Sequence, residues 1–233
     1  MPRDRRPRAA VDADPKAALF EQFARVGKAL ANPHRLVIVE LLAQGERSVD
    51  VLARQAGVPV GLASAHLQVL RRAGLVVAQR QGTHVIYQLA DDEAYRLVAA
   101  VQSFAVGHLA ETGRAARAYL GDAAPVELVS RQELLRRVMV GDAIVIDLRP
   151  TEEYLAGHIA GALSLPLSEL EARLADLPTT TEVVAYCRGP FCALAPQGVE
   201  LLRRSGRRAR RLQGGFPDWR SAGLPVAVGP APA

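Results

Sequence analysis

The chain has 233 residues, a length that fits one large domain or two small ones. Apolar residues make up 49% of it and charged residues 23%, which excludes a disordered or collagen-like protein. It has no apolar run of about 18 residues and no apolar stretch after its basic start, so we expect no membrane span and no secretory signal. The two cysteines, Cys187 and Cys192, share one short segment, which favours a reducing cytoplasm over a disulfide framework. The net charge of +5 permits a polyanionic partner.

The amino-terminal half reads as helices. Residues 1–15 hold three prolines and four arginines without periodic apolar positions, and they are expected to form a flexible basic tail. Apolar residues then recur at three- and four-residue steps, which predicts helices over 16–30, 33–44, 48–57 and 60–74. Asn32 and Ser48 are predicted to cap the second and third of these helices.

The spacing of the apolar residues changes after these helices. Residues 75–78 and 85–89 are short β-like runs, and residues 80–83 are predicted to form the hairpin tip between them. One long helix is expected from residue 91 to about 119, followed by a linker at 121–125. The predicted domains are therefore 16–120, mainly helical, and 126–233.

The carboxy-terminal half is expected to be α/β. Residues 143–146 and 183–186 are apolar without alternation, as buried parallel strands are, and helices are predicted over 133–140, 167–174 and 197–205. Residues 1–125 carry 16 basic and 12 acidic side chains and residues 126–233 carry 13 and 12, so the excess positive charge lies in the helical half.

Three helices followed by a hairpin is the element order of a winged helix-turn-helix, a fold that places its recognition helix against DNA. Polar side chains on the fourth helix and in the hairpin could reach base edges or phosphates. The predicted DNA-binding residues are Ser64, His66, Gln68, Arg71, Arg72, Arg80 and Thr83. The structural alternative is a winged helix used only for protein contacts.

Residues 64–76, SAHLQVLRRAGLV, resemble the S-x-H-L-x-x-L-x-x-A-G-L-V signature of the ArsR family of bacterial repressors. The resemblance covers about residues 16–118. It implies a homodimer, with the first and last helices at the dimer interface, that binds palindromic operators in double-stranded DNA.

The family's metal sites are not expected in this chain. Many relatives bind soft metals through an E-L-C-x-C-D-L segment, but residues 46–52 read ERSVDVL, without either sulfur. His108 and Glu111 lie at i, i+3 on the last helix but lack the D-x-H half of the family's zinc site, so a surface pair is the preferred interpretation. We expect neither a metal nor a cofactor.

Cys187 directly follows the predicted strand 183–186 and precedes a helix. A thiol in that position lies among free backbone N–H groups and the positive end of a helix dipole, which lowers a cysteine pKa and attracts anions. Arg188 adds positive charge. The loop is therefore expected to hold a thiolate that attacks an anionic sulfur or oxygen compound.

Three elements of this half resemble the rhodanese superfamily: D-x-R at 147–149, E-Y-x-x-G-H-I-x-G-A at 153–162 and G-G-x-x-x-W at 214–219. The resemblance covers about residues 126–228. It implies that Cys187 accepts a sulfane sulfur from a small-molecule donor as a persulfide, in a loop formed by Arg188, Gly189, Pro190, Phe191 and Cys192. Phosphatases of this fold use a loop one residue longer, so the six residues 187–192 favour sulfur.

Two further expectations concern residues around this loop. Cys192 stands where thiosulfate-using members often have an arginine or a small hydroxyl residue; it could attack persulfidated Cys187 to form a bridge, or it could be a buried small hydrophobe. Asp147 and Arg149 are expected to tie the end of the first strand to neighbouring loops, with Arg149 a nearby charge for the anion site.

The leading hypothesis is a cytoplasmic, dimeric transcriptional regulator that senses reactive sulfur at Cys187. A rival is a sulfurtransferase whose winged helix serves localisation or autoregulation. A third is an arsenite or soft-metal sensor that uses Cys187 and Cys192 and needs a third ligand.

Overall fold

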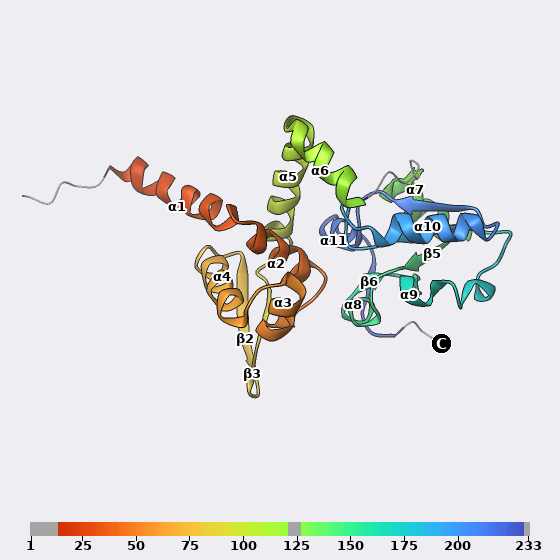
Figure 1. Ribbon diagram of the computed structural model, residues 1–233, viewed down its shortest axis with the longest axis horizontal. Helices are drawn as coiled ribbons and strands as arrows, with labels where there is room; N and C mark the ends of the chain where they lie inside the picture. Colours follow the sequence, from red (N-terminus) through yellow and green to blue (C-terminus); the bar gives the residue numbers. More distant parts are fainter. Residues whose placement is uncertain (1–13, 121–126, 231–233) are drawn as a thin grey trace, which may run out of the picture.

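The computed structural model describes residues 14–120 and 127–230 (Figure 1). The predicted linker at 121–125, and the predicted tail apart from residues 14 and 15, lie outside these ranges.

The first four helices are where the sequence predicts them: α1 (Pro15–Leu30), α2 (Pro33–Ala43), α3 (Val49–Ala56) and α4 (Val60–Arg72). The predicted caps are confirmed, since Asn32 accepts a hydrogen bond from the Arg35 N–H at 3.3 Å and Ser48 caps α3 through the N–H of Val51. A short strand β1 (Arg47–Ser48), which the sequence did not predict, pairs with β3 of the hairpin.

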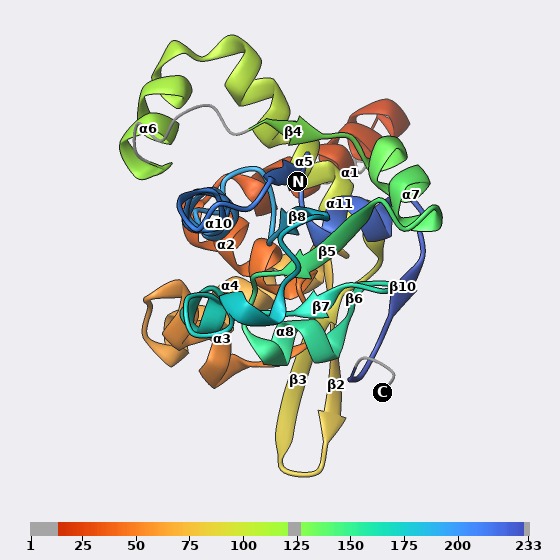
Figure 2. The ribbon, with the colours of Figure 1, turned by 90° about the vertical axis from the view of Figure 1, so that its right-hand side faces the viewer.

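The wing is a long hairpin of β2 (Val76–Gln81) and β3 (His84–Leu89), paired in antiparallel register up to Gln81 and His84. Its tip is only Gly82 and Thr83, with Gly82 in the left-handed region at φ 60°. The predicted tip at 80–83 is therefore too long, and Arg80 belongs to the strand. Figure 2 shows the hairpin projecting well beyond the rest of the molecule.

The single helix predicted over 91–119 is wrong. The chain forms α5 (Asp92–His108) and α6 (Ala110–Leu120), which separate at Leu109, where φ −110° and ψ 109° are extended values. Gly107, two residues before the break, weakens the helix locally.

A parallel sheet organises the second half, as predicted, and it has five strands. Its strand order is β4-β9-β8-β5-β7, and all four strand pairings are parallel. Its strands are β4 (Leu128–Val129), β5 (Ala143–Asp147), β7 (Leu163–Ser164), β8 (Glu182–Tyr186) and β9 (Ala209–Leu212). A separate pair joins β6 (His158–Ile159) to β10 (Val226–Ala227).

Helices cover both faces of this sheet. One core contains residues of α9 (Leu167–Leu170) and α10 (Leu194–Arg204), and the other contains residues of α7 (Arg131–Met139) and α11 (Phe216–Ser221). A short helix α8 (Thr151–Ala156) follows β5. The helix predicted over 167–174 stops at Leu170 and is followed by a 3-10 turn, Leu174–Asp176. No helix within 14–120 or 127–230 is long and apolar enough to cross a membrane.

Candidate functional site

The six-residue cysteine loop, residues 187–192, connects the carboxyl end of central strand β8 to the segment before α10. Residue 215 packs directly against its backbone: a Cβ there would lie 2.4 Å from the Gly189 nitrogen and 2.6 Å from the Cys187 oxygen. Only glycine fits this contact. The Phe216 N–H also donates to the Cys187 carbonyl at 3.0 Å, so the G-G-x-x-x-W segment holds the loop.

The two thiols of the loop are buried and differ in acidity. Burial raises the pKa of Cys187, with the N–H groups of Gly189 and Ala195 acting in the opposite direction. A hydrogen bond from the Cys187 thiol lowers the pKa of Cys192 to about 6, helped by the N–H groups of Arg188 and Leu194. The sequence assigned the acidic thiol to Cys187. In the structure the lowered pKa lies on Cys192, because Cys187 is the more deeply buried thiol and acts as a hydrogen-bond donor, with the Gly189 and Cys192 carbonyl oxygens at 3.9 and 3.7 Å from its sulfur.

The positive charge of Arg188 is already paired. Its Nε donates to both carboxylate oxygens of Glu153 at 3.1 and 3.0 Å, and its Nη2 donates to Oε1 at 2.6 Å. Glu153 lies on α8 and is 2% exposed. The guanidinium therefore supports the loop from the side instead of standing free for an anion.

Asp147 and Arg149 form a fully buried ion pair at 2.6 Å beside the loop. The remaining Arg149 donors reach the Gly157 carbonyl at 2.7 Å and the Gln44 side-chain oxygen at 3.1 Å. Asp147 also accepts from the Tyr186 hydroxyl at 2.6 Å. These contacts fit the expected tying role, and they leave the Arg149 guanidinium engaged with protein groups.

A cavity of about 470 Å³ lies between α5 and the loop. Its walls come from both halves of the chain and mix apolar with polar side chains. The lining residues are Tyr95, Ala99, Gln102, Ser103 and Val106 on α5, and Arg131, Pro190, Phe191, Gln213, Gly214 and Asp218 in the second half.

The structure divides the predicted DNA-binding residues into two groups. Gln68, Arg71, Arg72, Arg80 and Thr83 are exposed and Ser64 is half-buried, on α4 and the wing. His66 is buried and stacks against His34 with ring centroids 5.9 Å apart, an arrangement that disfavours the predicted DNA contact. It lies three residues after Ala63 and four before Leu70, both fully buried, and therefore on the inner face of the helix.

No group of three or more His, Cys, Asp or Glu side chains that could hold a metal ion occurs within the described ranges. His108 and Glu111 make local contacts: His108 stacks on Phe104, and Glu111 pairs with Arg114 at 3.2 Å.

Sequence reasoning missed three residues of the helical half that lie near the loop, two of which contact the other half. Gln44 at the end of α2 donates to the Arg188 carbonyl at 3.3 Å, and Arg47 of β1 contacts Glu153 at 3.0 Å. Glu40, one turn before Gln44, has its pKa raised by burial, while the nearby charge of Arg188 acts in the opposite direction. The E-Y-x-x-G-H-I motif contains Glu153, but nothing in the sequence singles out Gln44 or Glu40.

These features define a class of protein: a winged helix-turn-helix regulator joined to a rhodanese-like α/β domain. Profile comparisons agree, since a helix-turn-helix domain matches residues 30–78 and a rhodanese-like domain matches residues 130–222.

An HTH-type transcriptional regulator of Mycobacterium tuberculosis is 49% identical over 220 residues, which are 94% of this chain and 96% of that protein. The chain therefore belongs to this family of HTH-type transcriptional regulators, with an ArsR-type winged helix fused to a rhodanese-like domain.

Two partial relatives match one half each. A sulfurtransferase of Allochromatium vinosum is 34% identical over 88 residues, 37% of this chain and 80% of that protein. A solution structure from Mycobacterium bovis, described as the homodimeric winged helix-turn-helix DNA-binding domain of a possible ArsR-family regulator, is 51% identical. It covers 44% of this chain and 94% of that one, with a TM-score of 0.40.

Proposed function

We propose that this regulator responds to reactive sulfur species through Cys187. One observation carries the proposal: a buried pair of thiols, Cys187 and Cys192, occupies the loop between a central parallel strand and a helix, in a chain that also holds a DNA-binding fold. A small-molecule persulfide is the donor that this pair fits best.

The proposed chemistry starts from the different acidities of the Cys187 and Cys192 thiols. As the Cys187 sulfur attacks the outer sulfur of a persulfide R–S–SH, its proton passes to the Cys192 thiolate, the S–S bond of the donor breaks and R–S⁻ leaves. Cys187 then carries –S–SH and Cys192 is a thiol. In a second step, deprotonated Cys192 attacks the inner sulfur, forms a Cys187–Cys192 disulfide and releases HS⁻.

DNA binding is assigned to the exposed and half-buried polar residues of α4 and the wing. Gln68 and Ser64 can read base edges, whereas Arg71, Arg72 and Arg80 supply phosphate contacts. These residues would bind a palindromic operator in the cytoplasm.

Dimerisation is part of the same proposal. Large apolar side chains remain exposed on α1, which extends away from the rest of the chain (Figure 1), and around the end of α5; they are Leu19, Phe20, Phe23, Phe104 and Leu109. Exposed apolar surface of this extent is typical of an interaction site, and a second copy of the chain is the partner that a two-fold operator requires.

The test combines intact mass under non-reducing conditions with DNA binding, before and after exposure to glutathione persulfide. Wild type should gain sulfur or lose two hydrogens, and its DNA affinity should change. Cys187→Ser should bind DNA as unmodified wild type does, carry no sulfur at residue 187, form no bridge to Cys192 and not respond. A Cys187→Ser protein that responds like wild type would refute the proposal. Multiple turnover with a thiosulfate donor and a thiol or cyanide acceptor would favour the sulfurtransferase function instead.

A further inference from the structure

The side chain of Gln44 belongs to the DNA-binding half but lies inside the cysteine-loop region of the other half. Gln44 caps the end of α2 and is 1% exposed. Its Nε2 donates to the Arg188 carbonyl at 3.3 Å, and its Oε1 accepts from Arg149 at 3.1 Å. Because a carbonyl can only accept and a guanidinium can only donate, these two partners fix which way the amide points.

One peptide unit connects Gln44 to the reactive sulfur. The Cys187 sulfur lies 3.9 Å from the Gly189 carbonyl oxygen, and the Gly189 N–H acts to lower the pKa of its thiol; the carbonyl that shares a peptide with this N–H, on Arg188, accepts the hydrogen bond from Gln44. The N–H and C=O of a trans peptide lie in one rigid plane and point in opposite directions. A rotation of this plane toward an added sulfur atom must therefore move the carbonyl relative to Gln44.

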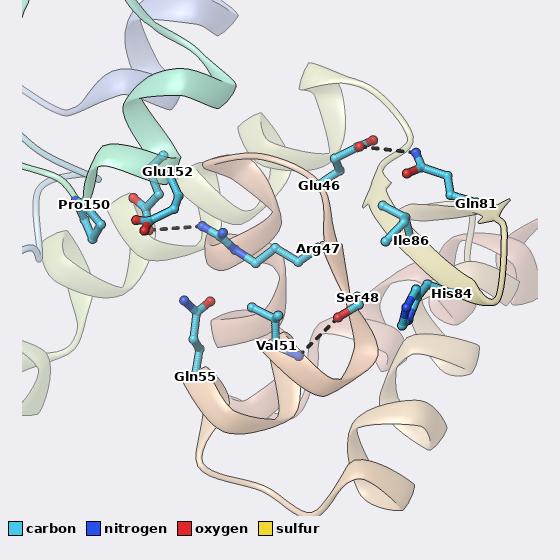
Figure 3. Close-up of a pocket in the computed structure, with 11 residues that line it drawn as sticks. Glu46, Arg47, Ser48, Val51, Gln55, Gln81, His84, Ile86, Pro150 and Glu152 are labelled. Carbon is cyan, nitrogen blue, oxygen red and sulfur yellow. Dashed lines mark hydrogen bonds and ion pairs between the residues drawn. The ribbon is translucent and has the colours of Figure 1, made fainter. Parts of the chain in front are cut away.

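The Arg188 side chain provides a second connection across the same boundary. Glu153, nearly inaccessible to solvent, accepts from both Arg188 and Arg47; the ion pair with Arg47 is the dashed line that starts at the Arg47 side chain in Figure 3. The backbones also approach closely here, since a Cβ on Gly45 would lie 2.9 Å from the Ala156 Cβ. The cysteine loop thus contacts the DNA-binding half directly through the Arg188 carbonyl, and the Arg188 side chain is linked to Arg47 through Glu153.

The contacted segment is the one that sets the start of the helix-turn-helix. Gln44, Gly45 and Arg47 occupy the turn between α2 and α3, and Ser48 next to them caps α3. Helices α3 and α4 pack against each other as the DNA-reading pair. A movement of this turn is therefore transmitted to α3 and α4 through only four residues of chain.

We propose that Gln44 and the Arg188–Gly189 peptide form the coupling element between the Cys187 loop and the DNA-binding domain. This inference rests on the proposed function, because it requires sulfur to be loaded at Cys187. Gln44 acts as a positioning residue: it touches no donor and no DNA. By reciprocity, bound DNA must change the equilibrium constant for Cys187 loading by the same factor as loading changes DNA affinity.

The test uses the full-length protein, a DNA duplex selected from a random library by the unmodified protein, and glutathione persulfide. Gln44→Met keeps the approximate side-chain shape and removes both hydrogen bonds. Gln197→Met is the matched control, because Gln197 is exposed on α10. DNA affinity is measured with and without loading, and loading is measured by intact mass with and without DNA.

We expect the coupling in wild type and in Gln197→Met to fall in the usual range of about 5–150-fold. In Gln44→Met the factor by which loading changes DNA affinity and the factor by which DNA changes loading should both fall close to one. Cys187 should still gain sulfur, and unloaded protein should still bind DNA. Gln44→Asn, one methylene shorter, is the second variant should Gln44→Met fail to fold, and its factors should also fall.

The outcomes separate the two proposals. Wild type that neither gains sulfur nor loses two hydrogens would refute the proposed function. Wild type that loads and responds, together with Gln44 variants that respond equally, would refute only the coupling role of Gln44.

Discussion

A methyl group added at Gly215 tests the geometry of the cysteine loop directly. Gly215 has a φ of −152°, an extended value that any residue adopts, so Gly215→Ala introduces no backbone strain. Its Cβ would lie 2.4 Å from the Gly189 nitrogen, 2.5 Å from the Arg188 carbonyl carbon and 2.6 Å from the Cys187 oxygen. All three are main-chain atoms of the loop, so no side-chain rotation can relieve the contact.

The magnitude follows from the required displacement. Ordinary carbon contacts begin near 3.4 Å, so the loop and residue 215 must separate by nearly 1 Å. Overpacking of this kind costs about 1–3 kcal/mol. For a domain of about 100 residues, each kcal/mol lowers Tm by roughly 4–8 °C. The displaced atoms are also those that direct N–H groups at Cys187, so the rate of sulfur loading should fall together with Tm.

Thermal unfolding and the rate of mass gain with glutathione persulfide measure these two effects. Gly107→Ala is the control, because a Cβ at Gly107 on exposed α5 meets nothing within 4 Å. That variant should keep or raise Tm, since alanine favours a helix by about 1 kcal/mol over glycine. Gly215→Ala with the Tm and loading rate of wild type would refute the proposed packing of the loop.

Three further predictions concern single contacts. Cys187→Ala removes the hydrogen bond that lowers the pKa of Cys192 to about 6, so the midpoint for alkylation of Cys192 by iodoacetamide should rise toward 9; an unchanged midpoint would contradict this cause. Because that pKa is lowered on folding, the thiolate of wild type stabilises the fold fully above about pH 9, and this contribution is lost as the pH falls through 6. Glu153→Gln should lower the free energy of unfolding in urea by about 1–3 kcal/mol, because Arg47 and Arg188 lose a shared, nearly inaccessible carboxylate. An unchanged urea midpoint of unfolding would show that the two arginines find other partners. Ala99→Trp would fill part of the cavity of about 470 Å³ beside the loop. Loading from glutathione persulfide should then slow roughly tenfold, equivalent to about 1.4 kcal/mol in the barrier, with less effect on the small donor hydrogen disulfide. Equal slowing of both donors would place the entry route elsewhere.

Local chemistry explains which elements the sequence could predict. Caps such as Asn32 and Ser48 act within four residues, and the apolar runs of β5 and β8 require burial on both faces, so both signals can be read from short windows. The separation of α5 from α6 at Leu109 has only weak local signals, because one glycine seldom ends a helix. The burial of His66 was available from its spacing, but the histidine side chain suggested a DNA contact.

The sequence predicted which residues form the cysteine loop, but it did not predict which of the two thiols has the lowered pKa. The position of Cys187 after a strand and before a helix indicated an acidic thiol, and such a thiol is present, but the depth of each sulfur decides which one it is. Cys187 is the deeper thiol and donates, so the lowered pKa belongs to Cys192. Depth depends on residues distant in sequence that cover the loop, including Gly215 and Phe216.

The contacts between the two halves are the feature that sequence patterns predict least. Gln44 reads as an ordinary helix end, and its partner Arg188 is 144 residues away. Yet a buried amide and a buried carboxylate must keep their hydrogen-bond partners, because leaving such groups unpaired is costly. If the halves separated, Gln44 would lose Arg149 and Arg188, and Glu153 would lose Arg47. The same groups contact the loop, so a change in the loop alters the contacts that hold the DNA-binding half against it.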